Sequence, residues 1–560
     1  MNGAELTIQV LRREGVEYVF GLPGTTIMHL IDALSRQDHI RYLSVRHEQV
    51  AAFMADGYAR AGGQVGVCMA SRGPGAANLT IGVHNAHAES VPVLALLGQV
   101  ADELYHRDAF EEMDLVRFFE PVTKWSVELH QADRIPELLQ RAVRTALSGR
   151  PGPVMVSLPL DVQLAEPDAA TAAAPQPRFR PAPPAPAVAE VEAAVTLLGA
   201  AERPVVVVGG GALQPGRRYD DNLLALAERL QLPVVTTWLR KNAFPNDSPL
   251  FFGSLGYGAP AVTEELVRSA DVLLALGCKF SEFATRRWTL LSPDTKLLQV
   301  DVDPAMLGRY YVPEVGICAD AAATTAALLA ATATLPARAS ELAARRRERL
   351  AALRTSYREQ TELPPTPPGA PQVSSGALIE ALRVVMARPG TVLVQDAPSF
   401  GTWIHRYLDF TAPGSFYAAA GGAMGWGFPA AMGMQLARPG DRIVAVSGDG
   451  SFWMVAQDLE TAVREHLPIV NVITNNFSFG NTRDRQRTAH GGRYLGVFYD
   501  NPDFAAFARL LGAHGERVEK DADLLPALDR ALDRGKPAVI DVVQDQHEGL
   551  PPDLVPPAAR

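Results

Sequence analysis

The sequence places a carboxylate and a side-chain amide directly after two neighbouring predicted strands. Asp449 follows an apolar run at 443–447, and Asn476 follows a second run at 469–474. In a βαβ unit the two strands run parallel, so their carboxyl ends meet at the ligand-binding edge of the sheet. Carboxylate and amide oxygens are hard ligands, which Mg²⁺ combines with phosphate oxygens and water. The pattern therefore predicts a magnesium and phosphate site at this edge.

Glycines surround the predicted metal ligand. Gly448 and Gly450 allow the backbone to approach a ligand closely, and the amides of Gly450 and Ser451 open the next helix towards an anion. A Gly-Asp-Gly tripeptide alone is usually only a turn. The pair of asparagines that ends at Asn476, after the neighbouring strand, favours the ligand site over a plain turn.

A second carboxylate stands near the amino terminus of the chain. Glu48 lies at the start of an apolar helix, just beyond a predicted strand. Taken alone, it is typical of an acidic residue favoured there by the helix dipole.

The chain resembles the thiamine-diphosphate-dependent enzymes. Gly448-Asp449-Gly450, with Asn476 following 27 positions after Asp449, resembles their cofactor signature. The resemblance implies that Asp449, Asn476 and the carbonyl of Ser478 bind Mg²⁺. It also implies that Glu48 bonds the ring nitrogen of the aminopyrimidine, and so promotes removal of the thiazolium proton.

Three more segments resemble cofactor-binding parts of this family: residues 19–24, 71–78 and 421–431. In the last of these, the carbonyl of Gly422 would accept the 4′-amino group, and Met424 would sit beneath the bend of the cofactor. The expected cofactor-binding residues are Pro23, Glu48, Asn78, Ser399, Gly422, Met424, Gly448, Gly450 and Ser451.

Within the family, the chain most resembles the acetolactate synthase large subunit, and residues 98–112 align with it without a gap. Two differences stand out. Glu111 replaces a glutamine, and residues 279–283 replace an Arg-Phe-Asp-Asp-Arg segment that is related to flavin binding. The sequence therefore predicts thiamine diphosphate and Mg²⁺ as cofactors and gives little support for FAD.

Three functions are compatible with these motifs. The first is a carboligase or decarboxylase that acts on a 2-oxo acid, in which the cofactor serves as the electron sink. The second is a lyase that splits an acyloin or a 2-hydroxyacyl thioester without releasing CO₂. The third is an inactive regulatory or binding subunit, against which the intact Glu48, Asp449 and Asn476 argue.

Glu111 bears on the choice of substrate, because the resemblance places it near the reacting centre as a second catalytic residue. An ionised carboxylate only accepts hydrogen bonds and would repel the carboxylate of a 2-oxo acid. Glu111 could be protonated, could face an arginine such as Arg107, or could indicate a substrate other than pyruvate. We favour the last two together. The plainest alternative is that Glu111 points to solvent.

These residues require elements to position them, and the chain alternates buried apolar runs with amphipathic helices. This alternation is typical of parallel sheets with helices on both faces. We expect three α/β domains, namely a pyrimidine-binding domain at 1–162, a middle domain at 188–345 and a diphosphate-binding domain at 375–548. Proline-rich linkers are predicted at 162–187 and 364–368. Gly209-Gly210-Gly211 lacks the full GxGxxG pattern of nicotinamide enzymes and is better explained as a tight turn.

The net charge, the cysteines and the lengths of the apolar runs argue against several classes of protein. A net charge of −10 argues against nucleic acid as a partner, and three separated cysteines argue against a disulfide framework. No signal peptide and no apolar run of spanning length is visible, so we expect a cytoplasmic protein that does not enter a membrane. The family resemblance implies a homodimer or homotetramer, with the cofactor between subunits and a 2-oxo acid or acyloin as substrate.

Overall fold

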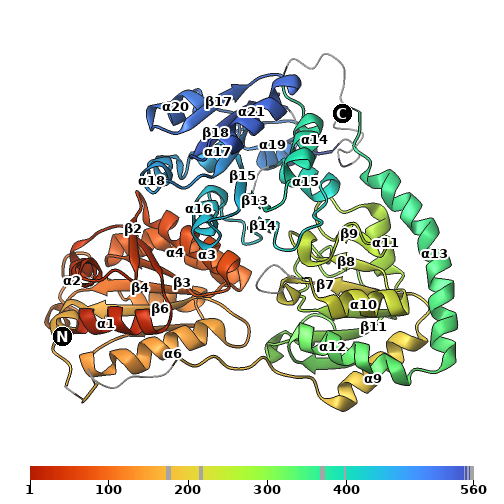
Figure 1. Cartoon of the computed structure of the whole chain (residues 1–560), viewed down its shortest axis with the longest axis horizontal. Coiled ribbons are helices and arrows are strands. Elements are labelled where there is room, and N and C mark those ends of the chain that lie inside the picture. Colours follow the sequence, from red (N-terminus) through yellow and green to blue (C-terminus); the bar gives the residue numbers. More distant parts are fainter. Residues whose placement is uncertain are drawn as a thin grey trace.

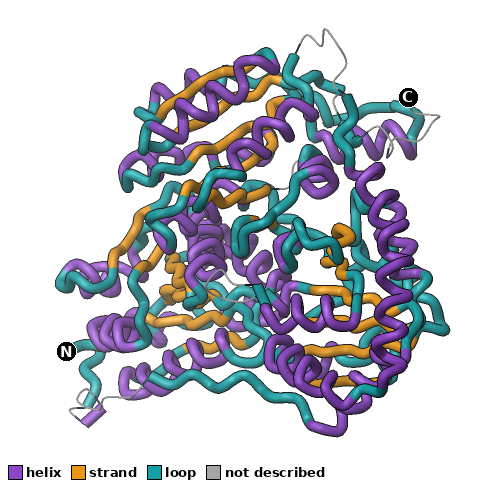
Figure 2. The backbone as a smooth tube through the Cα atoms, turned by 45° about the vertical axis from the view of Figure 1, so that its right-hand side comes forward, coloured by secondary structure: helices purple, strands orange, loops and turns teal. Residues whose placement is uncertain are grey.

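The computed structural model describes residues 1–168, 170–171, 178–213, 219–365, 372–396, 399–547, 549–551 and 554. The chain forms three parallel sheets of six strands each, with helices packed on both faces (Figures 1 and 2). The predicted α/β architecture of three parallel-sheet domains is confirmed. Among the described residues, no helix is both long enough and apolar enough to cross a membrane.

The first sheet has the strand order β2-β1-β3-β4-β6-β5. Its strands are β1 (Tyr18–Gly21), β2 (Arg41–Ser44), β3 (Gly66–Ala70), β4 (Val93–Gln99), β5 (Trp125–Glu128) and β6 (Val154–Pro159). Its helices are α1 (Gly3–Arg13), α2 (Met28–Ser35), α3 (Glu48–Gly62), α4 (Gly73–Glu89), α5 (Leu115–Phe119), α6 (Ile135–Leu147) and α7 (Leu160–Leu164). Strands β3, β4 and β6 are buried throughout, as expected for a sheet covered on both faces.

The third sheet repeats this topology, with the order β14-β13-β15-β16-β18-β17. Its strands are β13 (Thr391–Gln395), β14 (Phe416–Ala418), β15 (Arg442–Gly448), β16 (Val470–Asn475), β17 (His514–Val518) and β18 (Ala538–Val543). Its helices are α14 (Ser375–Met386), α15 (Gly401–Tyr407), α16 (Gly427–Ala437), α17 (Asp449–Phe452), α18 (Leu459–Arg464), α19 (Gly480–Ala489), α20 (Phe504–Leu510) and α21 (Asp521–Asp533). In both sheets the chain reverses direction beside the first strand, which creates a crevice at the carboxyl edge.

The middle sheet is different, with the order β12-β11-β10-β7-β8-β9. Its strands are β7 (Pro204–Val208), β8 (Val234–Thr236), β9 (Phe251–Ser254), β10 (Val272–Leu276), β11 (Lys296–Asp301) and β12 (Val315–Cys318). Its helices are α9 (Val188–Ala200), α10 (Asp221–Leu230), α11 (Ala261–Arg268), α12 (Ala321–Ala331) and α13 (Ala337–Thr361). The long α13 runs along one side of the molecule and leads to the third domain (Figure 1).

The first and third domains share one hydrophobic core, where α3 packs against α16 (Figure 1). Glycines allow the backbones of the two helices to lie in direct contact. A Cβ on Gly57 would overlap the backbone of Ala430, and a Cβ on Gly433 would overlap the carbonyl of Met54. Glu48 is the first residue of α3, so this packing helps to fix its position.

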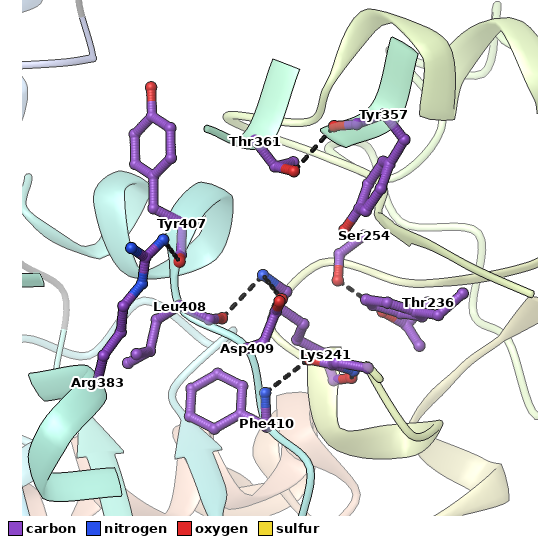
Figure 3. A network of polar contacts seen from close by, with 12 residues as sticks. Thr236, Lys241, Ser254, Tyr357, Thr361, Arg383, Tyr407, Leu408, Asp409 and Phe410 are labelled. Atoms are coloured by element: carbon purple, nitrogen blue, oxygen red, sulfur yellow. Dashed lines mark hydrogen bonds and ion pairs between the residues drawn. The ribbon is translucent and has the colours of Figure 1, made fainter. Parts of the chain in front are cut away.

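A buried lysine joins the middle domain to the third domain (Figure 3). Lys241 Nζ donates a hydrogen bond to the carbonyl of Leu408 at 2.8 Å and forms an ion pair with Asp409 at 3.2 Å. Nearby, Asn246 Oδ1 accepts a hydrogen bond from the backbone N–H of Phe410 at 2.8 Å. Because a buried charge is costly unless it is paired, these contacts define how the two domains meet.

The predicted linkers fall only partly within the described residues. Residues 178–187 form no helix or strand, and α9 begins at Val188. Residues 172–177 and 366–368 lie outside the described part of the chain, so these parts of the linker predictions stay predictions.

Candidate cofactor and metal site

Asp449 begins α17 at the carboxyl edge of the third sheet and is 2% exposed. Its Oδ1 accepts hydrogen bonds from the Gly450 N–H at 2.8 Å and from the Tyr499 hydroxyl at 2.9 Å, and its Oδ2 accepts from Asn501 Nδ2 at 2.9 Å. Burial raises the pKa of this carboxyl to about 6. A carboxylate has about four acceptor positions, so Asp449 keeps capacity for a cation.

The other predicted metal ligands lie close to one another. Ser478 Oγ donates a hydrogen bond to Asn476 Oδ1 at 3.2 Å, and Arg483 Nη1 donates to Ser478 Oγ at 3.0 Å. Ser399 joins this group, because a Cβ on Gly480 would lie 2.5 Å from Ser399 Oγ and 3.4 Å from Asn476 Nδ2. The structure thus brings together Ser399, Asn476 and Ser478, which the sequence predicted separately.

A short antiparallel pairing explains how Tyr499 reaches Asp449. Ser478 forms an isolated bridge with Phe498, and the N–H of Tyr499 donates to the carbonyl of Phe477 at 3.2 Å. Gly450 makes room for these side chains, since a Cβ there would lie 2.6 Å from the Phe479 ring. Tyr499 and Asn501 could not be identified from the sequence, because no motif connects them to a carboxylate about fifty residues earlier.

The set of donor groups fits Mg²⁺ better than a transition metal. Among the described residues there is no group of three or more His, Cys, Asp or Glu side chains that could hold a metal ion. Asp449 instead is a single carboxylate that is contacted by a backbone amide, a side-chain amide and a hydroxyl. Such a site, with one carboxylate, suits a hard cation that takes its remaining ligands from phosphate and water, whereas zinc prefers His and Cys.

The turn that precedes α16 lies beside α17. Gly422 and Gly425 both adopt left-handed conformations, with φ of 77° and 84°. A Cβ on Gly425 would lie 3.3 Å from the carbonyl oxygen of Ser451. Gly422 is exposed and Met424 is half-buried, so both can face a ligand at the edge where Asp449 lies.

Glu48 lies at the matching edge of the first sheet and is 8% exposed. Its Oε2 accepts a hydrogen bond from Asn78 Nδ2 at 2.9 Å, and its Oε1 would lie 3.2 Å from a Cβ on Gly75. Pro23 is exposed on the loop after β1, where the next residue, Gly24, packs against Ser71. Three of the predicted cofactor-binding residues, Pro23, Glu48 and Asn78, therefore share one edge of the sheet.

The third domain holds the turn that carries Glu48. The backbone N–H of Arg46 donates to Asp458 Oδ1 at 2.8 Å, and Gln49 Nε2 donates to the carbonyl of Met454 at 2.6 Å. Burial raises the pKa of Asp458 to about 6. The sequence contains no local signal for Asp458, because its contact with Arg46 spans 412 positions.

Glu111 lies beside an arginine, but it is Arg72 rather than the Arg107 that the sequence analysis named. Arg72 Nε is 3.4 Å from Glu111 Oε2. The side chain of Glu111 is 27% exposed, so it does not simply point to solvent. A signal for Arg72 is present in the sequence, because residues 71–78 resemble a Ser-Gly-Pro-Gly-Ala-x-Asn loop of the family and Arg72 departs from that pattern.

The middle sheet has the strand order of dinucleotide-binding folds, with its crevice between β7 and β10. Side chains and backbone of the chain itself fill the crevice between β7 and β10. Gly209 packs on the backbone of Gly277, and Arg240 lies over Gly210 and pairs with the buried Glu89 of α4. These contacts do not support the binding of FAD.

Two of the sheets have identical topology. One carries a buried glutamate at its edge, and the other carries a carboxylate, an amide and a hydroxyl. Together they define a class of cofactor-binding protein. The sequence matches the N-terminal TPP binding domain of thiamine pyrophosphate enzymes over residues 1–118, the central domain over 191–328 and the C-terminal TPP binding domain over 396–542. The chain belongs to the thiamine pyrophosphate enzyme family.

Its relatives include acetolactate synthase large subunits. A probable acetolactate synthase large subunit of Methanocaldococcus jannaschii is 35% identical over 100% of this chain and 94% of the relative. The large subunit of isozyme 2 from Escherichia coli (strain K12) is 34% identical over 100% of this chain and 98% of the relative. The large subunit from Corynebacterium glutamicum is 34% identical over 97% of this chain and 87% of the relative.

Proposed function

We propose that this chain is a thiamine-diphosphate- and Mg²⁺-dependent carboligase of the acetolactate synthase type, with a 2-oxo acid such as pyruvate as its substrate. The observation that carries the proposal is the pair of matching edges, with Glu48 and Asn78 on one sheet and Asp449 and Asn476 on the other. The names and full-length similarity of the relatives support this activity.

Each edge would hold one end of the cofactor. Mg²⁺ would bind Asp449, Asn476 and the carbonyl of Ser478. When bound, thiamine diphosphate supplies a nucleophilic carbon and an electron sink for reactions next to a carbonyl. We assign the diphosphate and the bend of the cofactor to Ser399, Gly422, Met424, Gly448, Gly450 and Ser451, and the pyrimidine to Pro23, Glu48 and Asn78.

Glu48 would share its proton with the ring nitrogen of the pyrimidine. Asn78 Nδ2 fixes one of its oxygens and leaves the other for the ligand. Glu111 would face the reacting centre from the same domain.

No observation favours a lyase or an inactive subunit, and we propose no role for FAD.

We propose a homodimer, or a homotetramer built from it, with each cofactor between two subunits. The solvent face of α4 supports this, because its exposed positions carry no acidic or basic side chain other than the histidine; they are Pro74, Ala77, Asn78, Ile81 and His84. Met454, next to the turn that carries Glu48, is also an exposed apolar residue. Contiguous exposed apolar surface is typical of subunit interfaces.

We further propose the domain limits 1–162, 188–345 and 375–548 and a cytoplasmic location. The strands of the three sheets fall within 18–159, 204–318 and 391–543, which supports the division into three domains, whereas α13 continues past 345 to Thr361.

The purified protein tests the activity directly. With thiamine diphosphate, Mg²⁺ and pyruvate, we expect release of CO₂ and formation of 2-acetolactate, and we expect neither when Mg²⁺ is removed by a chelator. CO₂ release that yields acetaldehyde alone would indicate a simple decarboxylase. Turnover of acyloins or 2-hydroxyacyl thioesters without CO₂ would indicate a lyase.

A further inference from the structure

A buried arginine lies beside the predicted metal ligands. Arg483 belongs to α19, the helix that follows Ser478, and only 1% of its side chain is exposed. Its Nε and Nη2 donate hydrogen bonds to Asp484 Oδ1 at 3.1 Å and 3.0 Å. A buried charge is costly unless it is paired, so this ion pair allows the guanidinium to stay charged in the interior.

The remaining nitrogen of the guanidinium faces the metal site. Arg483 Nη1 donates to Ser478 Oγ at 3.0 Å, and it also donates to the backbone carbonyl of Gln546 in the segment after β18. A Cβ on Gly549 in the same segment would lie 3.2 Å from Arg483 Nη2. Contacts on all three nitrogens therefore hold the guanidinium in one position.

The donor and acceptor capacities of these groups fix the direction of each hydrogen bond. A guanidinium can only donate, so Ser478 Oγ accepts from Arg483. The single hydroxyl proton of Ser478 is then directed to Asn476 Oδ1, which lies 3.2 Å away. Arg483, Ser478 and Asn476 thus form a hydrogen-bond relay in which every proton points towards the amide oxygen.

The relay selects which end of the Asn476 side chain faces it. The two ends of an amide have nearly the same shape, but the oxygen accepts hydrogen bonds whereas the nitrogen only donates them. The hydroxyl proton of Ser478 attracts the oxygen and disfavours the nitrogen. The Nδ2 atom of Asn476 lies towards Gly480 instead, 3.4 Å from the position of a Cβ there. Asn476 is buried, so its orientation depends on these contacts more than on water.

We propose that Arg483 is a positioning residue for the metal, which acts through the hydroxyl of Ser478 to keep the oxygen of Asn476 available to Mg²⁺. This inference rests on the metal site of the proposed function. The amide oxygen has two lone pairs, so it can accept from Ser478 and still bind a cation. An amide turned the other way would offer the metal a nitrogen without a free lone pair.

The other role assigned to Ser478 does not depend on its hydroxyl. The backbone carbonyl of Ser478 is held by the isolated bridge to Phe498 and by the neighbouring hydrogen bond from the N–H of Phe479 to the carbonyl of Val497 at 2.9 Å. Removal of the hydroxyl therefore breaks the relay and leaves the backbone carbonyl in place.

Ser478→Ala tests the relay with the smallest change. Mg²⁺ is titrated into the purified protein at a fixed concentration of thiamine diphosphate, and cofactor binding is followed by calorimetry. The Mg²⁺ concentration at half-saturation should rise about 10–100-fold, the usual effect of losing a partner that orients a metal ligand. Saturating Mg²⁺ should restore cofactor binding, which a general loss of folding would not allow. An unchanged Mg²⁺ requirement in Ser478→Ala would overturn the proposal.

Arg483→Met should raise the Mg²⁺ requirement as well, and Arg483→Lys, which keeps a donor, should recover part of the loss. The removal of a positive charge alone would strengthen the binding of a cation, so the two effects have opposite signs. Arg485→Met, at an exposed position of α19, is the matched control and should not raise the requirement. An equal rise in Arg485→Met, or tighter Mg²⁺ binding in Arg483→Met, would contradict the relay.

The double variant Arg483→Met/Ser478→Ala examines whether the two residues act together. Both changes break the same relay, so the double variant should need no more Mg²⁺ than the more affected single variant. Losses that add up would show that Arg483 acts by another route.

These titrations need no substrate, which separates the inference from the proposed carboligase activity. If the wild-type protein binds the cofactor with Mg²⁺ but does not convert pyruvate, only the activity fails. If Asp449→Ala leaves the Mg²⁺ requirement unchanged, the metal lies elsewhere, and both the proposed metal site and the relay fail. If Asp449→Ala raises the requirement and Ser478→Ala does not, the relay alone fails.

Discussion

At the scale of single residues, two buried carboxylates carry the proposed chemistry, and their surroundings differ. Glu48 accepts one hydrogen bond from a side-chain amide, from Asn78. Asp449 accepts from one backbone amide and two side chains. The hydrogen bonds to Asp449 stabilise its charged form, which suits a metal ligand, and they oppose the burial that raises its pKa to about 6.

Glu48→Gln should separate proton transfer from binding. The amide has nearly the same shape and can still accept from Asn78, so folding and cofactor affinity should be preserved. Exchange of the thiazolium proton should slow by about 10²–10⁴-fold, the usual contribution of an acid–base group. NMR of the bound cofactor in deuterated water measures this rate directly. Exchange at the wild-type rate would exclude Glu48 from the mechanism.

Asp449→Ala should remove the Mg²⁺-dependent part of cofactor binding. The remaining ligands, Asn476 and the Ser478 carbonyl, carry no charge, so affinity should fall at least about tenfold, given that interactions of charged groups contribute about 1.5–3 kcal/mol. Calorimetric titration with and without Mg²⁺ measures the difference. Asp523→Ala, on the exposed first turn of α21, is the control. Identical Mg²⁺-dependent affinity in Asp449→Ala would place the metal elsewhere.

At the scale of elements, the close contact of α3 and α16 joins the two cofactor-binding domains. The crossing depends on glycines at the points of contact, because any side chain there would meet backbone atoms of the other helix. In α16, a Cβ on Gly433 would overlap the Met54 carbonyl and would lie 2.9 Å from the Tyr58 N–H nitrogen. Backbone atoms cannot move aside as a flexible side chain can, so the helices would have to separate.

Gly433→Ala should therefore lower the free energy of unfolding, although alanine is the better helix former. Overpacking of a tight core typically costs about 1–3 kcal/mol. Gly440→Ala is the matched control, because a Cβ there would meet nothing within 4 Å, and its effect should stay within about 0.5 kcal/mol. Urea unfolding of both variants tests this. Equal stability would show that the helices can separate at little cost.

At the scale of the whole molecule, assembly should control activity. Ile81, 39% exposed on the solvent face of α4, should be covered in the proposed dimer. Ile81→Glu should shift the protein towards monomer and lower activity in parallel, because an unpaired charge would be buried. Leu510→Glu, an exposed apolar position on α20, is the control and should change neither. Sedimentation at assay concentration measures the distribution, and a fully active wild-type monomer would contradict the assembly.

The sequence determined the three α/β domains and most of the candidate site. Long apolar runs such as 443–447 and 469–474 predicted β15 and β16, because a strand covered on both faces is apolar throughout. Some strands escaped prediction. β5 is only half-buried and β14 has three residues, so neither carries a clear apolar run. The residue roles came from local motifs, in which a few adjacent positions supply a ligand and the glycines around it.

Only the tertiary structure decided which distant side chains meet. Tyr499 and Asn501 hold Asp449, Asp458 holds the turn before Glu48, and Arg72 rather than Arg107 faces Glu111. The charge of Glu111 and the need to neutralise it could be inferred from residue types, since an unpaired carboxylate near an anion is unfavourable. The identity of its partner could not be inferred, because it depends on how the loop that carries Glu111 packs over the glycine at the start of α4.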